Sequence, residues 1–462
     1  MPVNLPESFV SSVRQAVGPG FVREDAEALE AYGVDALQQG HPPDLVVIPG
    51  NAQEISAIAR LCTEHRVPLV VRGAGTGYTG GAVPTAGGLV LSMERLNRIL
   101  EIDELNLLAV VEPNVITADL QRAVEAVGLF YPPDPASLEK SSLGGNVAEC
   151  AGGPRAFKYG TTKRYVLALE AVLPTGEIVH TGSKAVKNVV GYDLTQLLVG
   201  SEGTLAIVTQ ITLRLVPKPP AYATLLASFR DIASAVDAVS ALIRRRVVPA
   251  AIELVDDDSL RAAQEYAKTQ VAPEGAHALL IVESDGTSAG VAEEIARVEE
   301  ACASAGALGV HRADSDAERA RIWSVRRDIS LALRATGLLK INHDVVVPRG
   351  RVPELFETVA TLKRDYALRV AAFGHAGDGN IHVNLMVDPA SADEVARARA
   401  AERVLFERVV ALEGSISGEH GIGFAKRPYL GLELSADEIA LMKRVKAAFD
   451  PANILNPGKI FP

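Results

Sequence analysis

The 462-residue sequence has few cysteines, few aromatic residues and no long apolar run. Its three cysteines, Cys62, Cys150 and Cys302, are far apart, so they offer neither a disulfide framework nor the grouped thiolates of an iron–sulfur cluster. No segment is long and apolar enough to span a bilayer, and the first residues lack the charged and apolar regions of a secretory signal. These absences predict a cytoplasmic protein without a transmembrane segment. Any electrons that it handles must leave through another molecule.

Basic residues are also in short supply. The 46 Lys and Arg residues are outnumbered by 57 Asp and Glu residues, which gives a formal net charge of −11. Binding to nucleic acid needs clustered cationic side chains, and the one basic run, residues 244–246, is short, so we expect no nucleic-acid partner. Apolar residues make up 48% of the chain, which is typical of a globular protein with large cores, and the length predicts two or three domains.

The apolar pattern divides the chain into four parts. Residues 43–219 alternate short strand-like runs with glycine-rich turns and a few helices, among them one at 116–127 with Thr117 as its N-cap, and they predict one α+β domain. Residues 220–416 predict a second α+β domain, in which helices cover one face of an antiparallel sheet whose strands include 344–348. Residues 1–42 are expected to form a helical segment. Residues 417–462, with a helix predicted at 436–449, are expected to dock back on the first domain.

Three glycine-rich segments within residues 43–219 suit a large polar cofactor. In the first, at 72–81, glycine amides can approach an anion closely. Three of these glycines are spaced as GxGxxG, but residues 82–88 cannot form the helix that a Rossmann site requires, so we reject an NAD site. A glycine-rich hairpin explains the first segment equally well. Two further clusters favour a dinucleotide, because so many backbone polar groups need partners. One comprises residues 132–137, 141–147 and 152–154, and the other residues 200–205.

A histidine pair is the sharpest signal in the second domain. His375 and His382 flank the turn residues 377–380, which predicts that His375 ends one strand and His382 begins its hairpin partner. Strand alternation then puts Asn384 on the same face as His382. Two converging imidazoles suit a borderline divalent metal such as zinc. The alternative is a turn histidine beside an ordinary sheet side chain.

Two further sets of polar residues are suited to a small acid. Glu419 and His420 lie between glycines and can supply one metal ligand and one base, although a surface loop explains them nearly as well. Arg326 and Ser330 are four residues apart in a helical stretch and share a face, and Lys340 opens the next strand-like run. Arginine with lysine makes a clamp for a carboxylate, whereas the alternative is a solvated basic face.

With these motifs in this order, the sequence resembles the vanillyl-alcohol oxidase and p-cresol methylhydroxylase (PCMH) family of FAD flavoproteins. Within that family it is similar to the branch of D-lactate dehydrogenases, the flavin subunit of glycolate oxidase and D-2-hydroxyglutarate dehydrogenase. The resemblance runs nearly end to end, and it implies a PCMH-type FAD-binding domain followed by a cap domain. FAD would be non-covalent, because Thr76 stands where some relatives carry the attaching histidine. The implied FAD contacts are Arg72, Gly73, Ala74, Gly75, Thr76, Gly77, Gly80, Gly81, Pro133, Asp134, Ser137, Gly144, Gly145, Asn146, Gly153, Gly203, Ile207 and Asn456.

The resemblance also implies a reaction, in which a D-2-hydroxy acid of the lactate, glycolate or 2-hydroxyglutarate class is oxidised to the 2-oxo acid and hydride passes to flavin N5. It implies that His375, His382 and Glu419 hold a divalent metal, with zinc expected, and that His420 is the general base. The remaining implied site residues are Arg326, Ser330 and Lys340 for the substrate carboxylate, and Asn384 for substrate orientation. Relatives often have threonine in place of Ser330, and the spacing to Lys340 is one residue shorter than in some.

Electrons would then pass to a separate acceptor, which could be a carrier protein, a quinone-linked partner or an iron–sulfur subunit, and a homodimer stays open. Two other functions compete with this one. The first is an FAD-dependent sugar or lactone oxidase that reduces oxygen, although such relatives lack the paired histidines and the Glu–His element. The second is a non-catalytic flavin-binding subunit of an oxidase complex, against which the intact set of catalytic residues argues.

Overall fold

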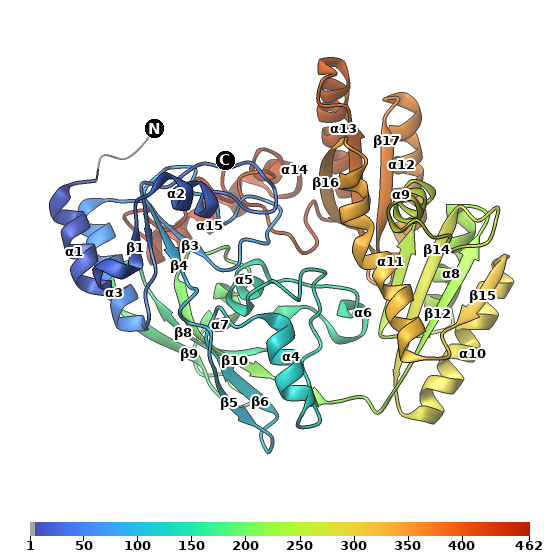
Figure 1. The fold of residues 1–462 in the computed structure, drawn as a ribbon, viewed down its shortest axis with the longest axis horizontal. Coiled ribbons are helices and arrows are strands. Elements are labelled where there is room, and N and C mark those ends of the chain that lie inside the picture. Colours follow the sequence, from blue (N-terminus) through green and yellow to red (C-terminus); the bar gives the residue numbers. More distant parts are fainter. Residues whose placement is uncertain (1–4) are drawn as a thin grey trace. The chain divides into compact units, whose positions relative to one another are not determined.

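The computed structural model describes residues 5–462, which divide into two compact units (Figure 1). Unit 1 contains the chain up to Gly152, Thr161–Lys218 and Glu419–Pro462, and unit 2 contains Gly153–Gly160 and Pro219–Gly418. Both units combine helices with sheets, so the predicted α+β class is confirmed. Within residues 5–462, every helix is too short or too polar to cross a membrane.

The first sheet of unit 1 has four short strands in the order β1-β2-β4-β3. Strands β2, β4 and β3 are parallel, whereas β1 is antiparallel to β2. Two helices pack their apolar sides on this sheet and bury Phe9, Ile55 and Leu69, and Leu455 from the C-terminal tail joins the same core. The elements are α1 (Glu7–Val17), β1 (Val22–Arg23), α2 (Ala26–Tyr32), β2 (Leu45–Val47), α3 (Ala52–His65), β3 (Leu69–Arg72) and β4 (Leu89–Ser92).

The second sheet of unit 1 has five antiparallel strands in the order β5-β6-β10-β8-β9. A separate two-stranded ribbon joins β7 to β11. The strands are β5 (Ile99–Asp103), β6 (Leu108–Val111), β7 (Leu129–Phe130), β8 (Val166–Val172), β9 (Ile178–Gly182), β10 (Ile207–Arg214) and β11 (Val216–Pro217). The helices of this part and of the C-terminal segment are α4 (Thr117–Glu125), α5 (Leu143–Glu149), α7 (Leu194–Leu198), α14 (Leu430–Glu433) and α15 (Ala436–Phe449).

Helix α4 corrects the expected role of Thr117. The residue at its N-cap is Ile116, and no side chain caps this helix. The hydroxyl of Thr117 instead donates to the carbonyl oxygen of Ser141 at 3.1 Å. The prediction of Thr117 as the N-cap was therefore wrong. Its hydroxyl bonds to a residue 24 positions away in the sequence instead of capping the start of the helix.

Unit 2 is built on one seven-stranded antiparallel sheet in the order β15-β12-β14-β13-β17-β18-β16. Strand β16 begins before the strand predicted at 344–348 and takes in the strand-like run predicted from Lys340, because it pairs with β18 along its whole length, from Leu339 with Val387 to Val346 with Asn380. The strands are β12 (Ala221–Phe229), β13 (Ala251–Val255), β14 (Ala278–Gly286), β15 (Gly309–Arg312), β16 (Leu339–Val346), β17 (Arg369–His375) and β18 (Asn380–Val387).

Helices cover this sheet on both faces, so the prediction that they cover only one face was wrong. Residues 278–285 of β14 are buried without interruption, and because their side chains alternate between the faces, each face must have a cover. Helices α9 and α11 pack on the side that holds Val255, Phe373 and Met386. Helices α8 and α10 pack against each other and against strands β12 and β14. The helices are α6 (Ala156–Tyr159), α8 (Ile232–Arg244), α9 (Asp257–Ala267), α10 (Ser288–Ser304), α11 (Asp316–Ala335), α12 (Val352–Asp365) and α13 (Ala392–Ala411).

Candidate functional site

The first glycine loop of unit 1 leaves β3 and reaches β4 without forming a helix at 73–88. Gly75 and Gly80 have φ values of +67° and +78°, which side chains disfavour. At the start of the loop, Arg72 Nη1 donates to the carbonyl oxygen of Val34 at 2.6 Å and fixes the end of β3. A loop of this kind differs from the strand–loop–helix of a Rossmann site, in agreement with the rejection of NAD.

Ser142 joins this loop to the second glycine cluster. Its Oγ accepts hydrogen bonds from the amides of Ala74 at 3.4 Å and Gly145 at 3.3 Å. A Cβ atom on Gly73 would collide with the same hydroxyl, so the two segments approach closely only because residue 73 is glycine. The segments that contain Gly73–Gly81 and Gly144–Asn146 thus lie side by side in unit 1.

Two amide side chains near these loops serve the scaffold. Asn146 is 4% exposed, and its Nδ2 donates to Thr117 Oγ1 at 2.7 Å, which links α5 to α4. Gln121 Nε2 donates to the carbonyl oxygen of Pro133 at 2.9 Å and so holds the segment with Asp134 and Ser137 against α4. Asn146 was expected to contact FAD. In the structure its side-chain amide bonds to Thr117.

The C-terminal segment reaches the same loops. Asn456 Nδ2 donates to the carbonyl oxygens of Gly81 and Glu202, each at 2.8 Å. The carboxylate of Glu202 in turn accepts the amides of Ile422 at 2.8 Å and Gly423 at 2.7 Å. Burial raises the pKa of Glu202, although these two amides oppose the rise. The structure therefore brings Asn456 and the segment before Gly203 to the first glycine loop.

His420 lies against that loop within unit 1. Its ring stacks on Tyr78, with centroids 5.3 Å apart and planes at 26°, and Thr79 Oγ1 donates to the carbonyl oxygen of His420 at 3.0 Å. Oε1 of Glu419 is 3.9 Å from His420 Nε2, and the same carboxylate lies so close to Gly152 that a Cβ there would approach it to 2.8 Å. The predicted base and one predicted metal ligand are thus carried by the unit with the glycine loops.

The other two predicted metal ligands lie on one hairpin of unit 2. As predicted, His375 ends β17, whereas β18 begins at Asn380, two residues before the predicted start at His382. The ring centroids of the two histidines are 5.4 Å apart, and their planes are at 84°. Asp344 on β16 is the cross-strand partner of His382, and its Oδ1 lies 3.9 Å from His382 Nδ1. Asp344 also accepts the amide of Gly418 at 3.0 Å. The chain passes into unit 1 at the next residue, which is Glu419.

A buried carboxylate that sequence analysis missed connects His375 to Arg326. Glu253 on β13 is 0% exposed, accepts a hydrogen bond from His375 Nδ1 at 2.5 Å and pairs with Arg326 Nε. The guanidinium of Arg326 also lies over the ring of Phe373, 4.7 Å from its centroid. Because Arg326 is only 5% exposed, it is a buried and well-oriented cation rather than part of a solvated basic face.

Ser330 and Lys340 meet, as expected of a shared anion site. Lys340 Nζ donates to Ser330 Oγ at 2.6 Å, across α11 and β16. Burial lowers the pKa of Lys340 to about 7, and the charge of Arg334 adds to the effect. An opposite charge beside a buried lysine favours its charged form, so a carboxylate is a chemically suitable neighbour for Lys340.

Asn384 is fully buried and bonded on both sides of its amide. Its Nδ2 donates to the carbonyl oxygens of Ala371 and His382, each at 3.1 Å, and its Oδ1 accepts from Asn342 at 2.8 Å. These bonds fix the hairpin near His382. The expected contact of Asn384 with substrate stays a prediction.

Three residues with evident roles in these clusters escaped sequence analysis: Tyr78, Glu253 and Asp344. Glu253 had a usable signal, since it interrupts an otherwise apolar strand, and a buried acid needs a partner. Asp344 had a weaker signal, because its strand also contains other polar residues. Tyr78 had no such signal, because its partner His420 is more than 300 residues away in the sequence.

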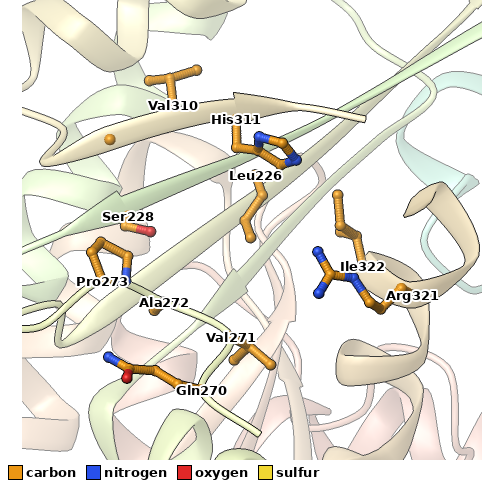
Figure 2. Close-up of a pocket in the computed structure, with 11 residues that line it drawn as sticks. Leu226, Ser228, Gln270, Val271, Ala272, Pro273, Val310, His311, Arg321 and Ile322 are labelled. Atoms are coloured by element: carbon orange, nitrogen blue, oxygen red, sulfur yellow. The ribbon is translucent and has the colours of Figure 1, made fainter. Parts of the chain in front are cut away.

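A cavity of about 550 Å³ opens elsewhere in unit 2 (Figure 2). It lies beside the edge strand β15, and its lining includes Leu226, Pro273, His311 and Arg321. None of the residues that line this cavity was predicted for the functional site. The volume of a cavity therefore does not by itself identify that site.

Two family comparisons cover most of the chain. Residues 43–182 match the family described as "FAD binding domain". Residues 218–460 match "FAD linked oxidases, C-terminal domain". The first match ends at residue 182, and the second begins at residue 218.

Curated proteins match nearly end to end. The glycolate oxidase subunit GlcD of Bacillus subtilis is 44% identical, over 97% of this chain and 95% of its own length. The same subunit of Escherichia coli K12 is 41% identical, over 98% and 91%. A D-lactate dehydrogenase of Anaerostipes hadrus is 37% identical, over 90% and 89%.

Solved structures share the fold at low sequence identity. The 4-ethylphenol oxidase of Gulosibacter chungangensis superposes with a TM-score of 0.80 at 20% identity, over 100% of this chain and 99% of its own. p-Cresol methylhydroxylase gives a TM-score of 0.80 at 18% identity, over 100% and 98%. At these identities the likeness establishes the fold alone.

Proposed function

Because the chain belongs to the FAD-linked oxidase family, with an FAD-binding domain and the C-terminal domain of that family, we propose that it oxidises a D-2-hydroxy acid to the 2-oxo acid. The predicted family is confirmed, and so is FAD as the cofactor class. The substrate would be of the lactate, glycolate or 2-hydroxyglutarate class, which the names of the glycolate oxidase subunits and the D-lactate dehydrogenase support. The observation that carries the proposal is the stack of His420 on Tyr78, which holds an imidazole against the glycine loop of the FAD-binding domain.

FAD fits the glycine clusters of unit 1. Positive φ values at Gly75 and Gly80 and the close approach at Gly73 leave backbone amides without covering side chains, as a pyrophosphate requires. Thr76 has no imidazole for covalent attachment, so we propose non-covalent binding. When bound, FAD would supply the hydride acceptor.

A divalent metal fits the imidazoles of unit 2. Because the carboxylate of Glu253 faces His375 Nδ1, the lone pair of this histidine is on Nε2, and His382 adds a second nitrogen ligand 5.4 Å away between ring centroids. We propose that Glu419 completes the set. Nitrogen ligands with one carboxylate favour zinc, which would supply Lewis acidity toward the substrate hydroxyl.

The remaining site residues would bind the substrate and move its proton. Arg326, Ser330 and Lys340 would hold the C1 carboxylate through charge-assisted hydrogen bonds. His420 would take the hydroxyl proton on its imidazole, which the stack on Tyr78 and the bond from Thr79 keep in place. Electrons would leave to a separate acceptor protein or subunit, which agrees with the description of two relatives as subunits.

Anaerobic reduction of the bound flavin tests this function. The intact chain is mixed without oxygen with short, long and dicarboxylic 2-hydroxy acids of both hands, and absorbance of the oxidised flavin is followed. We expect bleaching by the D-acids or by glycolate, which is achiral, and no bleaching by the L-acids. A colourless protein, or a flavin that neither glycolate nor any D-2-hydroxy acid bleaches, would refute the proposal. A sugar or lactone oxidase would instead bleach with sugars and contain no stoichiometric metal.

A further inference from the structure

The buried carboxylate of Glu253 contacts two side chains, His375 and Arg326. The proposed function gives these two side chains different roles. Glu253 lies on the central strand β13, where its cross-strand partner on β17 is His375. Oε1 accepts from His375 Nδ1 at 2.5 Å, while Oε2 pairs with Arg326 of α11. These partners are 122 and 73 residues away in the sequence. The sheet and the helix thus converge on a single acid.

The carboxylate determines the chemistry of its imidazole partner. A carboxylate can only accept hydrogen bonds, so the proton of His375 must be on Nδ1 and the lone pair on Nε2. An imidazole held in this way presents one defined nitrogen to a metal, in a defined direction. Without the acid, the ring could adopt the other tautomer or rotate.

The same acid orients the guanidinium. Glu253 holds one edge of Arg326, and the ring of Phe373 lies beneath its plane. Both oxygens of this buried carboxylate therefore have a partner: Oε1 accepts from His375 Nδ1, and Oε2 pairs with Nε of Arg326.

We propose that Glu253 is a positioning residue that orients His375 for metal binding and Arg326 for binding the substrate carboxylate. The inference rests on the proposed function, because it assumes those tasks for the two partners. Glu253 itself contacts neither the metal nor the substrate and acts only through His375 and Arg326.

The neighbouring strand offers a matched control. Glu283 on β14 is 1% exposed, and it accepts hydrogen bonds from Arg319 at 2.7 Å and Trp323 at 2.7 Å. Its pKa is lowered, with Arg319 outweighing burial. Neither partner is proposed to bind metal or substrate. Glu283→Gln therefore removes a buried charge from the same sheet without touching the candidate site.

The first experiment compares Glu253→Gln with Glu283→Gln in the intact FAD-loaded chain. Zinc affinity is measured by competition with a coloured chelator, and anion affinity as the inhibition constant of propionate, which lacks the reacting hydroxyl. We expect Glu253→Gln to weaken zinc binding roughly 10- to 100-fold and to raise the propionate constant, because its amide N–H opposes a donor of His375 or Arg326. Glu283→Gln should change only the free energy of unfolding. Equal effects of the two variants on zinc, or no effect of Glu253→Gln, would overturn the inference.

A spectroscopic readout separates positioning from stability. In the metal-free chain, ¹⁵N spectra of the nine histidine side chains, with His375 assigned from a His375→Gln sample, should show His375 protonated on Nδ1. Protonation on Nε2 alone would overturn the inference. If Glu253→Gln does not fold, Glu253→Asp can replace it, because aspartate keeps the charge on a shorter side chain. We expect Glu253→Asp to bind zinc more weakly while the proton of His375 stays on Nδ1. Unchanged zinc affinity in this variant would refute the inference. A wild-type chain that binds no zinc would refute the proposed metal as well, whereas unchanged zinc affinity in the variants would refute only the role of Glu253.

Discussion

If Lys340 binds the substrate carboxylate as proposed, we expect the affinity of the chain for small carboxylates to depend on pH near neutrality. Its pKa is lowered to about 7, first by burial and then by the charge of Arg334, and its Nζ reaches Ser330. The direction of the pH dependence follows from this shift, because a base with a lowered pKa loses its charge at a lower pH. Lys340 carries its positive charge below pH 7 and loses it as the pH rises through 7. An anion that needs this charge should therefore bind more weakly in alkaline solution.

The size of the effect follows from the titration of one group. At pH 6 most chains carry the charge, whereas at pH 8 about one chain in eleven does, so the inhibition constant of propionate should rise about tenfold over this range, or about 1.4 kcal/mol. The estimate applies when the bound anion keeps the lysine protonated, as an opposite charge at contact does.

The assay is inhibition of D-2-hydroxy-acid oxidation by propionate between pH 6 and pH 9 with an artificial electron acceptor. Lys340→Met should raise the inhibition constant at pH 6 and remove its dependence on pH, and Lys340→Arg should keep tight binding up to pH 9, because the guanidinium stays charged. Lys363→Met is the control, since Lys363 is a half-buried lysine of the same unit that pairs with Asp258 instead. A constant that does not change with pH in the wild type, or the same slope in Lys340→Met, would refute the assignment.

Three further results are expected. His420→Ala should slow anaerobic flavin reduction by roughly 10²- to 10⁴-fold with FAD retained, since only the base is lost, while the exposed His180→Ala should leave the rate unchanged; an unaltered rate in the first variant would remove His420 as the base. Asn456→Ala should lower the free energy of unfolding by about 1–3 kcal/mol and speed FAD release in ultrafiltration, because two buried carbonyl oxygens lose their donor, and retention of FAD at the wild-type level would count against it. Removal of metal by a chelator should stop substrate bleaching while flavin absorbance persists, and zinc should restore it; full activity without metal would refute the metal centre.

Local sequence patterns predicted much of the fold. The glycine loops, the hairpin between His375 and His382, and helix α15 at 436–449 were expected within a residue or two, since each depends on turn residues or on periodicity over a short window. Expectations failed where a distant partner decided the outcome. The hydroxyl of Thr117 bonds to Ser141 rather than capping its helix, and β16 is extended by pairing with β18.

The sequence by itself determined the family, the two α+β parts and the chemical types of the site residues, because motifs and apolar periodicity are properties of short stretches of chain. Only the tertiary structure decided that Ser142 joins two glycine clusters, that Tyr78 stacks on His420 and that Glu253 serves His375 and Arg326 together. Such contacts join residues tens to hundreds of positions apart. They depend on strand register and on which helix face meets the sheet, and no local pattern carries that information.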